Sequence, residues 1–197
     1  MKRISAHSLK ADPTITPEHQ KELFLVEGKS AASTLNQVRN RAQQEIFALQ
    51  GKLLNVRHAS LETIEANALC VQLIERLGCG IAEQCQPEKL RADRVVLLTD
   101  PDVDGAHARA LLAIFFGKVL RPLVESGKVL AVIPPGWRGV SGSDSQYFWT
   151  QDELDAYRVR NRAASVMRFR GVAQFSQAEC HTLLLDPSTR RQVRLSL

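Results

Sequence analysis

The sequence contains no apolar stretch that approaches the ~20 residues a membrane-spanning helix needs. Its basic start, MKRISAHSLKADPT, is not followed by a hydrophobic segment, so it lacks the form of a secretory signal. Internal repeats and low-complexity tracts are missing too. The 197 residues, 44% apolar and 24% charged, are ordinary for one sizeable core or a core with a smaller appendage. We therefore expect a soluble, cytoplasmic protein with no membrane partner.

The cysteines lack the spacing of a metal site. None of them forms a CxxC motif, and no paired histidines stand at zinc-finger distances. A disulfide framework does not suit a chain of this length with so few cysteines. We expect buried thiols at all four positions, which are Cys70, Cys79, Cys85 and Cys180.

The positive charge is concentrated in clusters. The stretch RVRNRAASVMRFR, residues 158–170, carries five arginines and no acid. Smaller groups lie at residues 39–41 and 190–194. Because the guanidinium group offers a planar fork of donors, such clusters suit a phosphate backbone. A solvated basic face is the alternative interpretation.

Strand and helix patterns alternate along the first two thirds of the chain. The apolar runs are continuous rather than alternating, which is typical of a parallel sheet covered on both faces. We predict strands over 21–28, 94–100 and 129–135, a strand or turn over 46–56, and helices over 30–44, 61–78 and 106–127. Ser30 could cap the first helix, Gly78 should end the second, and Pro122 should cap, kink or break the third.

After Pro135 the composition changes. We predict a loop over 136–146, a short strand at QYFWT, a helix over 151–159, and a final helix and strand in 176–197. The expected organisation is a loose leader (1–20), an α/β domain with a central parallel sheet flanked by helices (21–136), and a small α+β tail (137–197).

Acidic residues stand where two of the predicted strands end. Asp100, Asp102 and Asp104 alternate in TDPDVDGAH, and Glu27 ends the first strand. If the two strands are neighbours, these carboxylates converge on one crevice. Side chains at i and i+2 of extended backbone point the same way, so Asp100 and Asp102 can share an ion. Oxygen ligands without histidine or cysteine favour Mg²⁺, which serves phosphoryl transfer, while Glu27 could instead act as a general acid or base.

These motifs have three other interpretations. A calcium EF-hand loop starting at Asp100 needs a glutamate at its twelfth position, where the chain has Leu111. Asp104 could simply cap a helix that begins near Ala106. The stretch VEGKS lacks the GxxxxGK spacing of a phosphate-binding loop.

Several stretches in a common order carry a family resemblance. ELFLVEGKSAAS, QGKLLNV, VVLLTDPDVDGAHARALLAIFF, ESGKVLAVIPP, MRFRGV and LDPSTRRQVRLSL resemble the TOPRIM domain and tail of bacterial type IIA topoisomerase B subunits, gyrase B and topoisomerase IV B. The resemblance covers most of the chain after the leader. It implies a Rossmann-like TOPRIM domain over 21–136, followed by a tail subdomain similar to the end of these B subunits.

The resemblance also implies a function and a set of site residues. Glu27, Asp100, Asp102 and Asp104 would surround Mg²⁺ in a half-site for DNA cleavage and religation, with Glu27 as the catalytic residue. Mn²⁺ would substitute for Mg²⁺. The nucleophilic tyrosine would come from a gyrase A or topoisomerase IV A-type partner. Three residues match family positions near the DNA: Lys52, His107 and Arg109. As DNA-binding candidates we add Lys29, Arg168 and Arg170; for His107, packing or hydrogen bonding in the first helical turn is the alternative.

The chain also departs from the family pattern. The family's B subunits carry an ATPase and a transducer domain first, for which 197 residues leave no room, so ATP is not an expected ligand. In EGKSAAS, Lys29 replaces an acid, and Ala32 and Ser33 replace two glycines. In RFRGVAQF the second glycine and the glutamate of the family motif RYKGLGEM are gone. Three functions stay open: a cleavage module with an A-type partner, a non-catalytic DNA- or topoisomerase-binding regulator, and a stand-alone metal nuclease.

Overall fold

The computed structural model describes residues 20–196 and contains a five-stranded sheet in the order β2-β1-β3-β4-β8. Strands β2, β1, β3 and β4 run parallel to one another, and β8 pairs antiparallel with β4. The strands are β1 (Glu22–Glu27), β2 (Gln44–Leu49), β3 (Arg94–Leu98), β4 (Val129–Val132) and β8 (Gln192–Arg194). The predicted parallel sheet is therefore confirmed, with one antiparallel strand at its edge.

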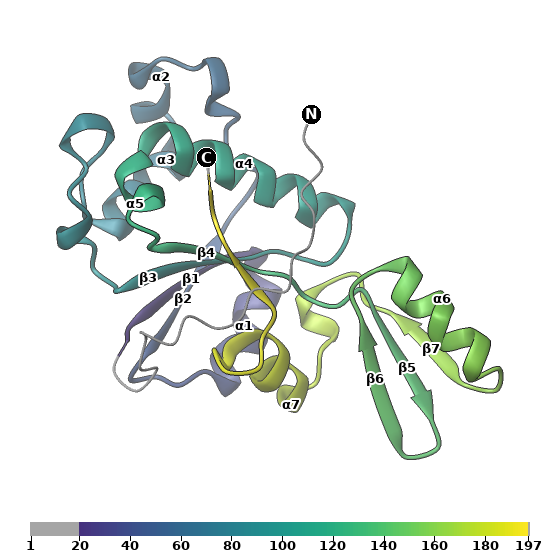
Figure 1. Cartoon of the computed structure of the whole chain (residues 1–197). Coiled ribbons are helices and arrows are strands. Elements are labelled where there is room, and N and C mark those ends of the chain that lie inside the picture. Colours follow the sequence, from purple (N-terminus) through teal and green to yellow (C-terminus); the bar gives the residue numbers. More distant parts are fainter. Residues whose placement is uncertain (1–19, 197) are drawn as a thin grey trace.

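Helices cover both faces of this sheet (Figure 1). One face packs against α2 (Leu61–Glu65), α3 (Ala68–Leu77), α4 (Val103–Val119) and α5 (Arg121–Glu125), and the other against α1 (Gly28–Val38) and the C-terminal α7 (Gln177–Glu179) with its π-helical continuation Cys180–Leu185. Along β1, Leu23 and Leu25 enter the first core and Phe24 and Val26 the second. Successive side chains of a strand point to opposite faces, so a strand buried on both faces must be apolar throughout.

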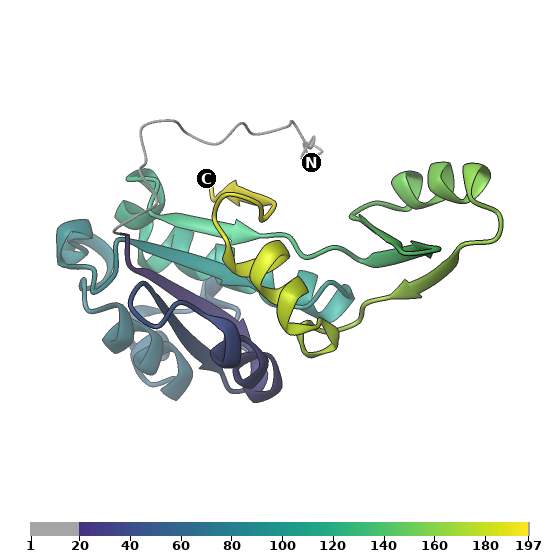
Figure 2. The same cartoon turned by 90° about the horizontal axis from the view of Figure 1, so that it is seen from below.

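A smaller unit projects from the main body (Figures 1 and 2). Its antiparallel sheet has the order β6-β5-β7, formed by β5 (Trp137–Ser141), β6 (Asp144–Phe148) and β7 (Ser165–Arg168), and α6 (Gln151–Arg160) packs on it. We call residues 137–168 the projecting lobe. The predicted loop over 136–146 is wrong, because this segment contains β5 and the turn to β6. Gly139 in β5 lies where an added Cβ would come within 2.6 Å of the Tyr157 ring, so this glycine serves packing.

Several helices begin or end at other residues than predicted. Helix α1 starts at Gly28, so Ser30 lies inside it, and it ends at Val38. The predicted helix over 61–78 is two helices, because Asn67 accepts a hydrogen bond from Cys70 N and caps a new start. Gly78 ends the second one with a φ of 71°, as predicted. The helix after β3 breaks at Leu120, ahead of Pro122.

Short 3₁₀ turns complete the structure at Val56–His58, Ala82–Gln84, Pro87–Lys89 and Val172–Gln174, the last labelled η5. All four cysteines are buried free thiols, which confirms that prediction. Within residues 20–196, no helix is long and apolar enough to cross a membrane. The predicted leader lies, apart from Gln20, outside the described residues. The boundary at residue 136 stays a prediction; β8, from the tail, belongs to the main sheet.

Candidate functional site

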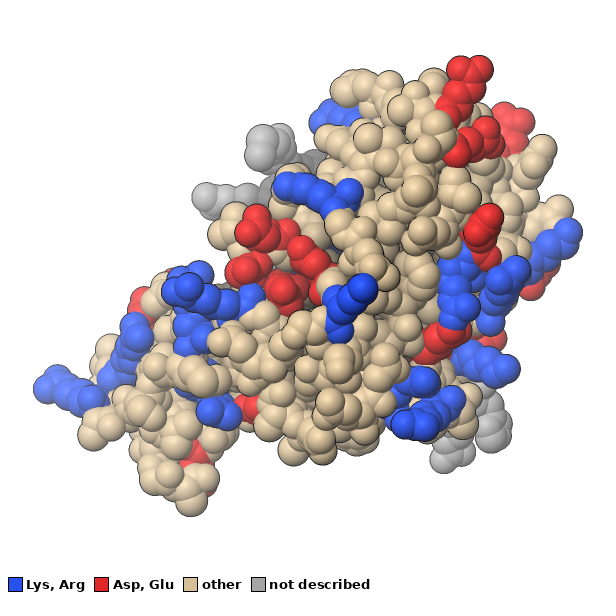
Figure 3. Space-filling view, turned by 180° about the vertical axis from the view of Figure 1, so that it is seen from behind, with Lys and Arg blue, Asp and Glu red and all other residues tan. Residues whose placement is uncertain are grey.

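Strand order brings the predicted acidic residues to one end of the sheet. Strands β1 and β3 are parallel neighbours in which Val26 pairs with Leu98. Glu27, the last residue of β1, and Asp100, two residues after β3, therefore lie at the same end of the sheet on adjacent strands. Figure 3 shows acidic side chains gathered in a hollow between the main body and the projecting lobe, with Lys and Arg side chains around them. This is the crevice at which ligands of open parallel sheets bind.

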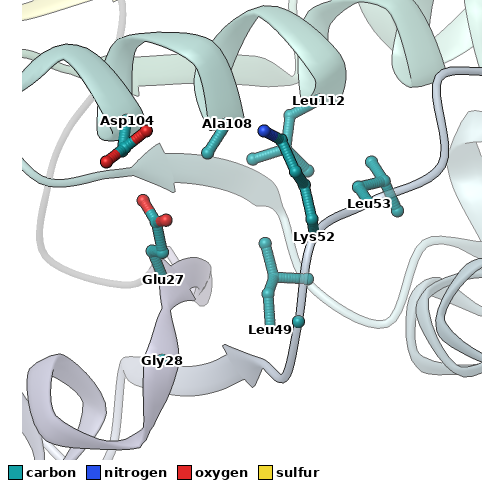
Figure 4. Close-up of a pocket in the computed structure, with 9 residues that line it drawn as sticks. Glu27, Gly28, Leu49, Lys52, Leu53, Asp104, Ala108 and Leu112 are labelled. Atoms are coloured by element: carbon teal, nitrogen blue, oxygen red, sulfur yellow. The ribbon is translucent and has the colours of Figure 1, made fainter.

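A pocket of about 360 Å³ opens at this end of the sheet. Figure 4 shows the carboxylates of Glu27 and Asp104 pointing toward each other, while the ammonium group of Lys52 reaches into the same space. Apolar side chains form the rest of the wall: Leu49, Leu53, Ala108 and Leu112. The pocket thus combines the two carboxylates of Glu27 and Asp104 and the ammonium group of Lys52 with an apolar wall.

The electrostatics of Glu27 favour binding of a cation. Its Oε2 atom is buried and has no hydrogen-bond partner among the described residues. Burial raises the pKa of Glu27, and the charges of Asp100, Asp102 and Asp104 raise it further, while Lys52 opposes them. A carboxylate in this position gains from a bound cation, which would offset both burial and repulsion.

Two of the aspartates already make backbone contacts. Asp100 Oδ1 accepts a hydrogen bond of 2.7 Å from the amide of Val172. Burial raises the pKa of Asp100, the Val172 hydrogen bond lowers it, and Asp102 raises it. Asp102 Oδ1 accepts from Gly105 N at 2.8 Å and caps α4. The cap is therefore Asp102 and not Asp104, because α4 starts at Val103.

The donor set fits Mg²⁺ bound partly through water. Among residues 20–196, no three His, Cys, Asp or Glu side chains are placed so that they could hold a metal ion together. Magnesium usually takes one or two carboxylates and keeps several waters. The orphaned Glu27 oxygen, the facing carboxylate of Asp104 and the like charges around them match that requirement.

The DNA-binding candidates lie in four places. Lys52 lines the pocket, whereas Lys29 is exposed on the first turn of α1 and His107 on α4. Arg109 is half-buried and donates from Nη1 to Thr99 Oγ1 at 3.1 Å, and burial lowers its pKa. Arg168 and Arg170 are exposed at the base of the projecting lobe, with the Arg168 guanidinium 6.0 Å from the Trp137 ring centroid.

Sequence reasoning missed two contributors to the site. One is the Val172 amide, whose donor belongs to the backbone and leaves no residue-type signal. The other is Thr99, a fully buried hydroxyl that holds Arg109. A polar residue that directly follows a buried apolar strand could have pointed to Thr99.

Gly105 allows a close approach on which the site depends. A Cβ added there would lie 2.1 Å from the Asp100 carbonyl oxygen, so the backbone would have to move. We expect Gly105→Ala to destabilise the chain by about 2 kcal/mol or more and to displace Asp100, weakening Mn²⁺ binding in calorimetry. Gly136→Ala is the control, since an added Cβ meets nothing within 4 Å there. Equal urea unfolding curves for the two variants would contradict this expectation.

Comparison with known proteins identifies the family. The model of the Toprim domain matches residues 22–133. The chain belongs to the Toprim family. It is 33% identical over 189 residues to the B subunit of DNA gyrase from Thermotoga maritima, covering 95% of this chain and 30% of the relative. It is also 32% identical over 193 residues to the B subunit of DNA topoisomerase 4 from Streptococcus pneumoniae, covering 93% and 30%.

These findings confirm the resemblance to gyrase B and topoisomerase IV B and the Toprim α/β fold. The gyrase B protein of Archaeoglobus fulgidus is similar to the same extent, at 32% identity over 187 residues. The chain spans about 30% of the length of the relatives it matches. The Toprim match ends before the projecting lobe. The segment after that lobe supplies the contact from Val172 to Asp100.

Proposed function

We propose that this chain is a Mg²⁺-dependent Toprim module that forms a B-type half-site for DNA cleavage and religation and works with a tyrosine-bearing A-type partner. The observation that carries the proposal is the buried, unpartnered Oε2 of Glu27 at the end of β1, on a carboxylate that faces the one of Asp104 in the first turn of α4. Asp100 and Asp102 add negative charge to the same place. The relatives named DNA gyrase and DNA topoisomerase 4 support this substrate, and the role would be carried out in the cytoplasm.

Glu27, Asp100, Asp102 and Asp104 would surround the ion, with one or two of them in direct contact and the others bound through water. When bound, Mg²⁺ would polarise the scissile phosphate and stabilise the charge on the attacking or leaving oxygen. The raised pKa of Glu27 suits a group that takes up and returns a proton during the reaction. Lys52 would fix a phosphate oxygen at the pocket, and the arginines of the lobe would hold the flanking backbone.

The tyrosines of the described residues are poorly suited to act as the nucleophile. Tyr147 donates its hydroxyl proton to Glu179 at 2.8 Å, and burial together with that carboxylate raises its pKa to about 12. Tyr157 is buried in the core of the projecting lobe, against the Phe148 ring at 4.8 Å between centroids. These environments favour a tyrosine supplied by a gyrase A or topoisomerase IV A-type partner.

A non-catalytic role is the second candidate. Asp100 and Asp102 each have one carboxylate oxygen occupied by a backbone amide, which leaves fewer free ligand atoms. Lys29 stands where the family motif has an acid. In this interpretation the chain binds DNA or a host topoisomerase and regulates it. A stand-alone metal nuclease is the third candidate and needs no tyrosine.

The test starts with Mg²⁺ and Mn²⁺ titrations by calorimetry on the native chain, Glu27→Gln and Asp102→Asn. We expect binding by the native chain and at least a tenfold loss in either variant. The native chain is then mixed with supercoiled DNA, Mg²⁺ and an A-type partner, and covalent protein–DNA complexes are trapped with detergent. Complexes that need both proteins and Glu27 support the proposal. Nicking by the chain alone would favour the nuclease, and an interaction with DNA or the A-type partner without cation binding would favour the regulator.

A further inference from the structure

The tail of the chain reaches back into the acidic site. Residues 170–175 form a turn, hereafter the tail turn, which lies directly after the projecting lobe and outside the segment that matches the Toprim family. From this turn the amide of Val172 donates to Asp100 Oδ1 at 2.7 Å, across 72 residues of sequence. The backbone of the tail turn therefore contacts one of the carboxylates assigned to the ion.

The conformation of the tail turn leaves this amide free to donate outward. Gln174 Oε1 accepts hydrogen bonds from the amides of Arg170 at 2.6 Å and Gly171 at 3.2 Å. The amide of Gln174 itself donates to Gly171 O at 3.1 Å. The Val172 amide is the first of η5, where a 3₁₀ turn offers no internal acceptor. It can therefore serve Asp100.

Packing fixes the tail turn against the body. Val172 is 1% exposed in the core formed with α1. The ring of Phe169, just before the turn, stacks on that of Phe175, the last residue of the turn, with centroids 4.0 Å apart and planes 12° apart. Gly171 brings bare backbone against the site, since a Cβ there would lie 3.5 Å from Asp100 Oδ2. A rigid turn holds its donor at a defined place, which an exposed side-chain donor would not.

The contact has a physical use beside an ion. A hydrogen bond from an amide to a carboxylate is charge-assisted and strong, yet it brings no positive charge that would compete with a cation. It occupies one oxygen of Asp100 and restricts rotation of the carboxylate. The second oxygen is then held in one orientation toward the ion. Groups that orient metal ligands in this way commonly affect ion affinity by about 10- to 100-fold.

We propose that the backbone amide of Val172 is a positioning group that orients Asp100 for the divalent cation. The ion site is then composite, because the Toprim segment provides the carboxylates and the tail turn aligns one of them. This inference rests on the proposed function and deepens it. By linkage, cation binding and docking of the tail turn stabilise each other, so the position of the adjoining lobe is coupled to the ion.

A matched pair of variants isolates the amide. Val172→Pro removes the N–H group, and proline fits the first position of η5 after Gly171, which is extended with φ −154° and ψ 153°. Val172→Ala keeps the N–H group and removes most of the buried side chain. Mn²⁺ affinity is measured by calorimetry and electron paramagnetic resonance, and hydrogen exchange of the native Val172 amide is followed with and without Mn²⁺.

We expect Val172→Pro to weaken Mn²⁺ binding by about 10- to 100-fold, Val172→Ala to leave the affinity within a few-fold, and Mn²⁺ to slow exchange of the native amide. Equal affinities of the two variants, with the native chain binding Mn²⁺, would overturn this inference and leave the proposed function standing. A native chain that binds no Mn²⁺ overturns both. If Val172→Pro does not fold, Gln174→Ala should weaken binding and Gln174→Glu restore it, and equal affinities of those two overturn the inference.

Discussion

Replacing Arg190 with alanine is expected to lower the free energy of unfolding by about 3–5 kcal/mol, a large part of the 5–15 kcal/mol typical of a domain. The Arg190 side chain is fully buried and pairs with both oxygens of Glu22, one of them at 2.8 Å from Nη1. It also donates to Leu185 O at 3.0 Å and lies 5.4 Å from the Phe24 ring centroid. Without the guanidinium, the Glu22 carboxylate would remain buried without a countercharge at the start of β1, with a 3.3 Å hydrogen bond from Gln44 Nε2.

The neighbouring arginine provides the control. Arg191 is 49% exposed, lies 3.4 Å from Glu153 and packs over Trp149, so Arg191→Ala should cost no more than about 1 kcal/mol. The double variant Glu22→Leu with Arg190→Met should recover most of the stability, because a buried pair can be replaced by apolar residues of similar size. Urea denaturation measures all three. An Arg190→Ala variant as stable as Arg191→Ala would refute this expectation.

The main sheet could be predicted because its signal is local. Strands β1, β3 and β4 are continuous apolar runs, and only a strand buried on both faces needs such a run. The projecting lobe could not be predicted in the same way. Its strand β5 reads WRGVS, and Gly139 there makes room for the Tyr157 ring, a contact between residues 18 positions apart. Glycine and serine in such a segment favour a loop when seen without their neighbours.

The same difference between local and long-range signals decides which parts of the site could be predicted. The acidic side chains could be named from their types and spacing, and their convergence followed once β1 and β3 were neighbours. The roles of Asp102 and Val172 could not, because each depends on a backbone hydrogen bond. Whether Asp102 or Asp104 caps α4 is decided by where the helix starts, and boundaries are the least predictable part of a helix.

The arginines of the projecting lobe and of the adjoining tail turn should dominate binding to double-stranded DNA. The triple variant Arg162→Gln, Arg168→Gln and Arg170→Gln removes three exposed guanidinium groups, two from the projecting lobe and one from the tail turn that follows it. Each phosphate contact contributes about 0.9 to the slope of log affinity against log salt, so the slope should become shallower by about 2.7. At 50 mM salt, losing these three phosphate contacts corresponds to a loss of DNA affinity on the order of a thousandfold. Fluorescence anisotropy with a short duplex in EDTA measures it without any metal.

A control variant that loses the same charge elsewhere distinguishes DNA binding at the lobe from general attraction between DNA and a basic protein. Three other exposed arginines lie near the opposite end of the main sheet: Arg41 before β2, Arg91 before β3 and Arg121 at the start of α5. Their replacement by glutamine lowers the net charge by the same amount, from +5 to +2. Because charges beyond a Debye length of about 10 Å are screened at 0.1 M salt, this control should retain most of the affinity and the native slope. Equal losses in the two triple variants would show that DNA senses only the net charge, and the lobe would then have no special part in holding the duplex.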